Sequence, residues 1–214
     1  MTQTVSAMFD RSEDARRAVQ DLEAIGVPHH DISLVANNAR GDHGVGESAN
    51  FAGPGEGRQD TGREAGEDAG KGAGIGAALG GAGGLLAGLG ALAIPGLGPV
   101  VAAGWLVSTA VGALGGAAVG AAAGGLVGAL THAGVPEEDA HVYAEGVRRG
   151  GALVSARVDD ALAGRAQEAL DRGSVDVKAR REDYRQEGWT RFDEGAPAYT
   201  TEQMAAENNR YRQV

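Results

Sequence analysis

The chain has 214 residues, a net charge of −10 and a sequence pI near 4.9. This acidic balance excludes the basic face that a nucleic-acid partner needs, and the lack of cysteine excludes disulfides, thiolate zinc sites and thiol nucleophiles. Glycine accounts for 37 residues and aromatic residues for 4%, so we expect any folded core to be small and aliphatic.

Residues 1–36 predict a strand, a helix and a second strand. Thr4–Phe9 alternates apolar and polar residues, as a half-buried strand does. Asp10 is the expected N-cap of the helix, with Glu13 completing a capping box, and Gly26 ends the helix. The second strand is expected at Ile32–Val35.

Residues 37–70 predict a disordered, acidic, glycine-rich linker. Phe51 is the single aromatic residue among Gly, Asp, Glu, Arg and Ser. Such a stretch buries too little apolar surface to offset the entropy lost on ordering. We therefore interpret it as a tether.

Residues 72–131 form an apolar segment without Asp, Glu, Lys, Arg or His. Small residues recur within it at intervals of four, and on an α-helix this spacing makes one bare face that another helix can approach closely. The first set is Gly72, Gly76, Gly80, Gly84 and Gly88, and the second is Gly104, Ser108, Gly112, Gly116, Gly120, Gly124 and Gly128. We expect these residues to form helix-packing faces.

The stretch Ile94–Pro99, with two prolines and two glycines, predicts a break between two helices. The helices Ala73–Ala93 and Val100–Leu130 would be about 31 Å and about 46 Å long. Each length is enough to cross a hydrocarbon core of about 30 Å. We therefore expect residues 71–133 to form a glycine-zipper hairpin that contacts membrane lipid through 72–131 and joins copies of the chain through its glycine faces.

The composition of this hairpin leaves two alternatives open, because Gly and Ala are only weakly lipophilic. The hairpin is either a soluble, self-associating pair of helices or a segment that changes between soluble and membrane-bound forms. The stretch Met1–Asp10 lacks the basic and then apolar pattern of a signal peptide. We therefore expect both termini to be cytoplasmic, with an entirely cytoplasmic protein as the alternative.

The part after the insert predicts two helices and two further strands. Val135–Asp139 opens a helix, because proline is tolerated in the first turn and acids suit the positive end of the helix dipole. Gly150 and Gly151 end it, and Ala152–Val158 predicts a third strand. Another helix leads to a short fourth strand at Val175–Val177.

The order β-α-β followed by α-β-α-β predicts an α+β fold. We expect a ferredoxin-like antiparallel sheet of four strands with helices on one face, formed jointly by residues 1–36 and 134–179. The helix at Pro136 is additional to that pattern. It either replaces part of the layer that covers the sheet or extends the insert.

Residues 180–214 are mostly polar and predict a mostly flexible C-terminal tail. Trp189, Phe192 and Tyr199 provide an alternative, because these aromatic side chains would let the tail dock onto the domain. The stretch Glu202–Arg212 predicts a short exposed helix.

Three stretches resemble the bacterial general stress protein seventeen-M-like domain family: Asp10–Val27, Gly134–Ala140, and Tyr143–Gly151 followed by a Val-rich strand. The resemblance covers about residues 4–36 and 134–179, and glycine-rich inserts between the two parts are typical of the family. It implies induction under heat, salt, cold or desiccation, with no established catalytic activity.

No nucleophile, base and orienting acid can be assembled from the sequence, so we expect neither an enzyme nor a cofactor. Gly66–Lys71 resembles a phosphate-binding loop but is one residue short and lacks the following Ser or Thr. The triplet His29–Asp31 contains metal-ligand types, yet neighbouring histidines on a turn point apart and favour a solvated loop. Arg148 and Arg149 predict a solvated helix end, or a contact with lipid headgroups if the hairpin inserts.

These observations predict a non-enzymatic stress-response protein in which a cytoplasmic domain is attached to a membrane hairpin. A soluble homo-oligomeric interaction module is one alternative. A small-molecule sensor is the other, and it rests on fold analogy alone.

Overall fold

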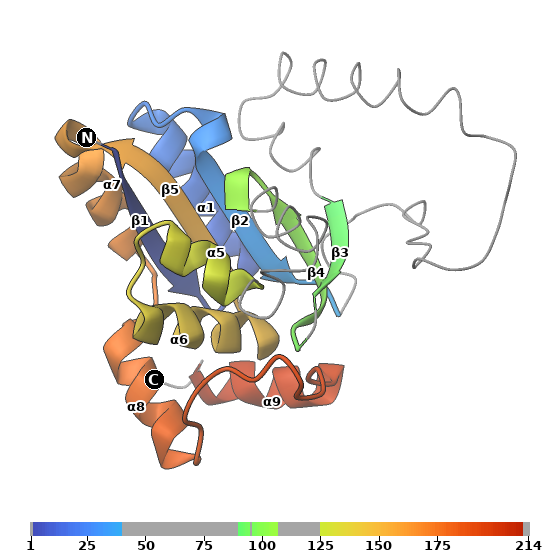
Figure 1. Cartoon of the computed structure of the whole chain (residues 1–214). Helices are drawn as coiled ribbons and strands as arrows, with labels where there is room; N and C mark the ends of the chain where they lie inside the picture. The colour runs from blue at the N-terminus through green and yellow to red at the C-terminus, as the bar shows by residue number, and fades with distance from the viewer. Residues whose placement is uncertain (1, 40–89, 95, 107–124, 212–214) are drawn as a thin grey trace, which may run out of the picture.

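The computed structural model describes residues 2–39, 90–94, 96–106 and 125–211 (Figure 1). Its centre is a five-stranded sheet in the order β1–β5–β2–β4–β3, in which every neighbouring pair is antiparallel. The strands are β1 (Thr2–Phe9), β2 (Ile32–Asn37), β3 (Gly90–Ile94), β4 (Gly98–Ala103) and β5 (Ala152–Asp159). This arrangement confirms the α+β class and the antiparallel sheet.

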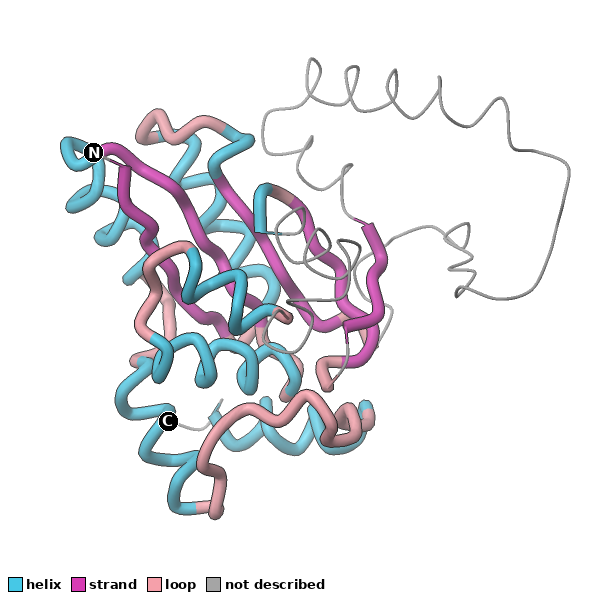
Figure 2. Tube along the Cα trace, in the orientation of Figure 1, coloured by secondary structure: helices cyan, strands magenta, loops and turns pink. Residues whose placement is uncertain are grey.

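Helices cover both faces of the sheet (Figure 2). They are α1 (Ser12–Ala24), α5 (Leu126–His132), α6 (Glu137–Arg148), α7 (Asp160–Asp171), α8 (Val177–Gln186) and α9 (Thr201–Tyr211), with the 3-10 helix η1 (His29–Asp31) before β2. Helices α1 and α7 pack on one face, α5 and α6 lie on the other, and α8 and α9 lie beyond α6. The expectation of helices on one face only is therefore wrong.

The strands themselves explain the second helical layer. All six residues of β2 are buried, and the consecutive residues Leu153 and Val154 of β5 are both fully buried although they point to opposite faces. A strand that is apolar on both faces needs cover on both. Helix α6 supplies this cover, and its Tyr143 hydroxyl donates a hydrogen bond to the Ser6 carbonyl oxygen at 3.1 Å. The helix after Pro136 thus belongs to the layers that cover the sheet.

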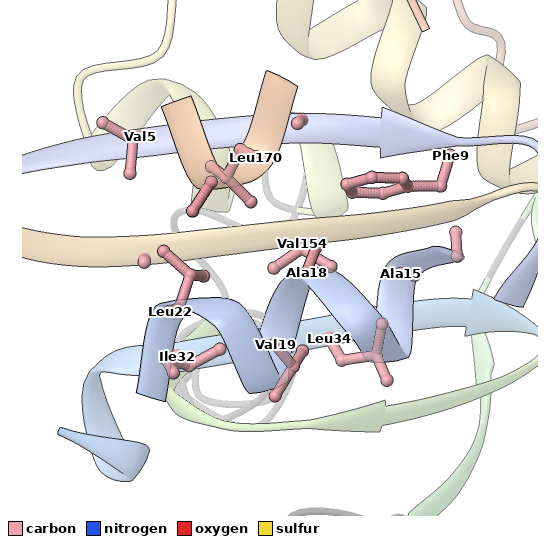
Figure 3. Close-up of a cluster of buried hydrophobic side chains, with 14 of the residues drawn as sticks. Val5, Phe9, Ala15, Ala18, Val19, Leu22, Ile32, Leu34, Val154 and Leu170 are labelled. Carbon is pink, nitrogen blue, oxygen red and sulfur yellow. The ribbon is translucent and has the colours of Figure 1, made fainter. Parts of the chain in front are cut away.

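Helix α1 forms as the sequence predicts, because its apolar residues recur at helical spacing. Ala15, Ala18, Val19 and Leu22 are buried against the sheet, and Figure 3 shows Leu22 close to Ile32 of β2. Gly26, at a φ of 97°, follows the last turn. A left-handed residue in this place is a common way for a helix to end, and glycine adopts it without steric cost.

Two local predictions, the N-cap of α1 and the fourth strand, were wrong because the aspartate side chains at these places make other interactions. The N-cap of α1 is Arg11 without a side-chain capping bond, since the carboxylate of Asp10 pairs with Arg180 instead. The predicted strand Val175–Val177 is also absent from the described sheet. Asp176 caps α8 there, and its carboxylate accepts hydrogen bonds from the first turn of that helix.

The predicted break in the apolar segment is the turn of a β-hairpin rather than of a helical hairpin. Strands β3 and β4 pair from Ile94 opposite Gly98 to Gly90 opposite Ala102. Val100 and Val101 are buried in the sheet, so the predicted helices Ala73–Ala93 and Val100–Leu130 do not extend over these residues. Proline and glycine between two apolar runs predict a hairpin turn equally well, and β-branched valines favour a strand.

The described part of the chain contains no helix with both the length and the hydropathy needed to cross a bilayer. Residues 40–89 and 107–124, which hold most of the predicted hairpin and linker, lie outside the described residues.

The pairing of β4 with β2 predicts which part of the insert can be removed. We expect a chain in which a Gly/Ser linker of about 12 residues replaces 40–89 to melt cooperatively, because β2 and β3 are parallel and a crossover of about this length joins such strands. Replacing 40–131 also removes β4, Leu126 and Leu130, so that variant should lose cooperative melting. Circular dichroism during heating measures both. Equally cooperative melting of the two variants would show that β4 is dispensable.

Candidate functional site

The charged side chains at the C-terminal end of α6 are buried in the protein and are not exposed to solvent. Glu145 is fully buried, and Arg148 and Arg149 are 8% and 6% exposed. Gly146 lets this turn lie close to β1, because a Cβ there would overlap the sulfur of Met8. The interpretation of the two arginines as a solvated or lipid-facing helix end is therefore wrong.

Glu145, Arg148, Arg149, Glu187 and Glu207 form one connected group, which we call the charge cluster. One carboxylate oxygen of Glu145 accepts hydrogen bonds from Nη2 of Arg148 at 2.9 Å and Nε of Arg149 at 2.8 Å. Nη1 of Arg149 donates to Glu187 at 2.6 Å and to Glu207 at 2.8 Å. The cluster therefore joins α6 to the residue after α8 and to α9.

Aromatic rings enclose the two guanidinium groups of the cluster. The guanidinium carbon of Arg149 lies 4.0 Å from the ring centroid of Tyr184. That of Arg148 lies 5.3 Å from the ring of Tyr199 and 5.7 Å from the ring of Phe192. Cation–π contacts at these distances stabilise desolvated charges. The same rings belong to the segment after α6, so they attach that segment to the domain.

The electrostatics of the cluster hold Arg149 charged and Tyr184 neutral. Burial opposes the charge of Arg149, but its hydrogen bonds to Glu145 and Glu207 outweigh this effect and keep its pKa above the usual value. Burial raises the pKa of Tyr184, although Arg180 and Arg149 act in the opposite direction. Neither group is poised to exchange a proton near neutral pH, so the arrangement serves attachment rather than acid–base chemistry.

A second attachment joins α8 and α9 to the end of β1. Arg180 donates to both carboxylate oxygens of Asp10, each at 2.9 Å, and its guanidinium carbon lies 3.4 Å from the ring of Tyr211. We call residues 177–211 the C-terminal clamp. The prediction of a mostly flexible tail at 180–214 does not describe this segment, since Tyr184, Phe192 and Met204 are buried. The structure corresponds to the docked alternative, and the helix expected at Glu202–Arg212 is α9.

A cavity of about 850 Å³ lies between α5, the start of α6 and residues 190–194 of the clamp. Val127, Gly128 and Phe192 contribute to its walls, as do the polar side chains of Glu137 and His141. Its volume is in the range of small-molecule pockets. Within this lining, His141 Nε2 lies 3.7 Å from Oε1 of Glu137.

Two of the predicted helix-packing residues lie in the described parts of the chain, and they do not share a helix. Gly104 follows β4 at a φ of 90°, where a Cβ would overlap the carbonyl oxygen of Ile32. It is a tight bend, from which Trp105 Nε1 donates to the Asp31 carbonyl at 3.1 Å. Gly128 lies in α5 and borders the cavity. The other members lie outside the described residues: Gly72, Gly76, Gly80, Gly84, Gly88, Ser108, Gly112, Gly116, Gly120 and Gly124.

The histidine pair forms part of η1. His29 Nδ1 lies 2.8 Å from Glu23, whereas the side chain of His30 is 79% exposed and lies 3.4 Å from Asp31. The two side chains thus use different partners. Among the residues that the structure describes, no group of three or more His, Cys, Asp or Glu could hold a metal ion.

Comparisons with protein-family models, with curated proteins and with solved structures found no match for this chain. The function is therefore inferred from the residues and their geometry. The charge cluster was missed at the sequence level, although one signal was present. Glu145 precedes Arg148 and Arg149 at the three- and four-residue spacings of helical ion pairs, and aromatic residues follow in the tail.

We expect Arg149→Ala to destabilise the protein by about 3–5 kcal/mol, because it leaves the buried carboxylate of Glu145 without one of its two cations. Loss of the clamp should also make the connection between α8 and α9 sensitive to proteases. Urea unfolding and limited proteolysis measure the two effects. Arg165→Ala, at an exposed position of α7, is the control and should change stability by less than about 0.5 kcal/mol. Equal stability of both variants would argue against the clamp.

We expect the buried hydroxyl of Tyr143 to make the folded state less stable at alkaline pH. Burial and the nearby charge of Asp139 raise its pKa to about 12, above the value near 10 of an unfolded tyrosine. Its contribution is therefore fully present below pH 10 and is lost as the pH rises to 12. At pH 11 the stability advantage of the wild type over Tyr143→Phe should be smaller than at pH 8 by about 1.4 kcal/mol. Urea titrations at the two pH values measure this difference, and an unchanged advantage would contradict it.

Proposed function

We propose that the chain is a non-enzymatic bacterial stress-response protein that acts as an interaction module. A ferredoxin-like domain, closed by the C-terminal clamp, carries glycine-rich segments that bind other copies of the chain. One observation carries this proposal. The separate stretches that resemble the general stress domain, residues 4–36 and 134–179, combine into one unit in which β5 lies between β1 and β2.

The ferredoxin-like description is supported by how this unit is connected. Strand β1, helix α1 and strand β2 form a parallel β-α-β unit whose two strands are separated by β5. Helix α7 follows β5 and packs beside α1 on the same face. A fourth strand would pair with β1 next, and Val175 N donates one hydrogen bond to the Met8 carbonyl oxygen at that position.

The ends of the glycine-rich runs favour association between copies over a membrane-spanning hairpin. The uncharged runs 72–89 and 107–124 are each about 18 residues long, or about 27 Å as helices. A run whose two ends join the same domain must cross a bilayer an even number of times, and two crossings need about 40 residues. Leu106 and Leu126, which flank the second run, are buried in the same cluster.

The composition of these two runs favours association between copies of the chain through their small residues. Faces of Gly, Ala and Ser let helices approach closely, and the contact is made by van der Waals packing. The net charge of −10 argues against a nucleic-acid partner. We therefore propose a homo-oligomer in the cytoplasm, and binding to lipid is the competing outcome of the experiment below.

The experiment compares Gly120→Leu with the matched control Ala122→Leu, which adds the same side chain on another side of a helix. Both positions lie outside the described residues, so the pair tests the sequence pattern. We expect the wild type and Ala122→Leu to form oligomers by light scattering and to restore the survival of a deletion strain after heat or salt stress. Gly120→Leu should form smaller oligomers than the wild type and should not restore survival, because its side chain separates the packed faces.

Two results would contradict the proposal. Identical oligomers and survival for Gly120→Leu and the wild type would show that the glycines are only compositional. Flotation of the wild type with liposomes, with retention after carbonate washing, would favour the membrane anchor instead.

A further inference from the structure

Strand β1 forms one edge of the sheet and leaves most of its outer side unpaired within the described residues. Its inner side pairs with β5 along the whole strand, from Thr2 opposite Asp159 to Phe9 opposite Ala152. On the outer side, the Met8 carbonyl oxygen accepts the hydrogen bond from Val175 N at 2.8 Å. The chain then enters α8 and turns away from the strand.

The position of this one bond identifies which backbone groups face outward. Backbone groups alternate sides along a strand with a period of two. Because the carbonyl of Met8 faces outward, the N–H and C=O groups of Thr2, Thr4 and Ser6 also face outward. The Ser6 carbonyl oxygen accepts one hydrogen bond from the Tyr143 hydroxyl, and its second lone pair can accept another. Thr2 is exposed and Thr4 is partly exposed, so this part of the edge is accessible.

Strand β1 lacks three features that commonly prevent strands from pairing between molecules: a charged side chain, a proline and a bulge. The sequence Thr2–Phe9 contains no charge and no proline, and its register with β5 is uninterrupted. The outer side of β1 at Thr2–Ser6 therefore has the length and the hydrogen-bonding pattern to accept one more antiparallel strand.

We propose that a second copy of this chain supplies that strand, with β1 pairing with β1 around a two-fold axis at Thr4. In this register Thr4 lies opposite Thr4, and Thr2 lies opposite Ser6. These side chains share one face of the sheet, where Ser6 and Ser155 already form a hydroxyl pair at 2.8 Å. Thr–Thr and Thr–Ser pairs stabilise neighbouring antiparallel strands, and no like charges face each other across the axis.

The second copy fits this place because the segment is complementary to itself. A two-fold interface requires one patch to match the same patch on its partner. The short uncharged stretch Thr2–Ser6 meets this requirement in the antiparallel direction. The resulting dimer would join two five-stranded sheets into a continuous one. This interface is independent of the glycine-rich runs and therefore of the function proposed above.

The test uses light scattering and sedimentation of the full chain. Thr4→Pro removes an outward N–H while the ladder with β5 is kept, since edge strands tolerate proline on their open side. We expect it to weaken dimerisation at least tenfold at unchanged thermal stability. The control Gln3→Pro removes an N–H that faces Val158 of β5, so it should lower the melting temperature instead. A wild type that is monomeric, or a Thr4→Pro dimer as tight as the wild type, would overturn the proposal.

A charge exchange at the axis tests the register itself. In a Gly120→Leu chain, Thr4→Lys and Thr4→Glu should each be monomeric, because like charges would meet across the axis, and a mixture of the two should form a heterodimer. Homodimers of either variant, or the lack of a heterodimer, would refute pairing at Thr4. Repeating the Thr4→Pro measurements in a Gly120→Leu chain separates this interface from glycine-mediated association. A failure of the proposed function changes the comparison of Gly120→Leu with the wild type. A failure of this inference changes only the results of the Thr4 variants.

Discussion

The pairing of β5 with both β1 and β2 is the constraint on which the rest of the structure depends. Because β5 lies between β1 and β2 in the sheet, β1 pairs with a strand that begins only at Ala152. Leu153 and Val154 are fully buried on opposite faces, so the strand requires a helical layer on each side. Helices α1 and α7 provide one layer, and α5 and α6 provide the other. The clamp is the outer cover of this second layer.

Local sequence pattern predicted the elements whose residues are buried on one face. Helix α1 is an example, because Ala15, Val19 and Leu22 follow helical spacing and Gly26 ends the helix. Strand β4 shows the limit. Val100 and Val101 lie in an uncharged segment where a helix and a buried strand have the same composition, and pairing with β2 decides between them. The predicted fourth strand shows the same limit. Val175 donates a hydrogen bond to the Met8 carbonyl of β1, but Asp176 then caps a helix, so no strand continues.

The candidate site was less predictable than the fold for a physical reason. Charged residues at a helix end are usually solvated. The burial of Arg148 and Arg149 depends on a later segment, whose carboxylates lie 38 and 58 positions after Arg149. Glu187 and Glu207 supply the carboxylates, and Tyr184 and Tyr199 supply the rings. No single stretch of sequence contains the cluster. The glycine pattern was predictable as a pattern, but Gly104 shows that one of its members is a bend required by contact with Ile32.

The late position of the central strand has a consequence for how the protein is made. Ser6 and Ser155, which face each other in the sheet, are separated by 149 positions. During synthesis the first strand, α1 and β2 leave the ribosome well before β5, and two strands with one helix are marginally stable alone. Long-range strand pairing also slows folding because the loop must close before its contacts form. The nascent N-terminal part therefore stays without its partner, and its apolar strands are open to chaperones, until most of the chain has been translated.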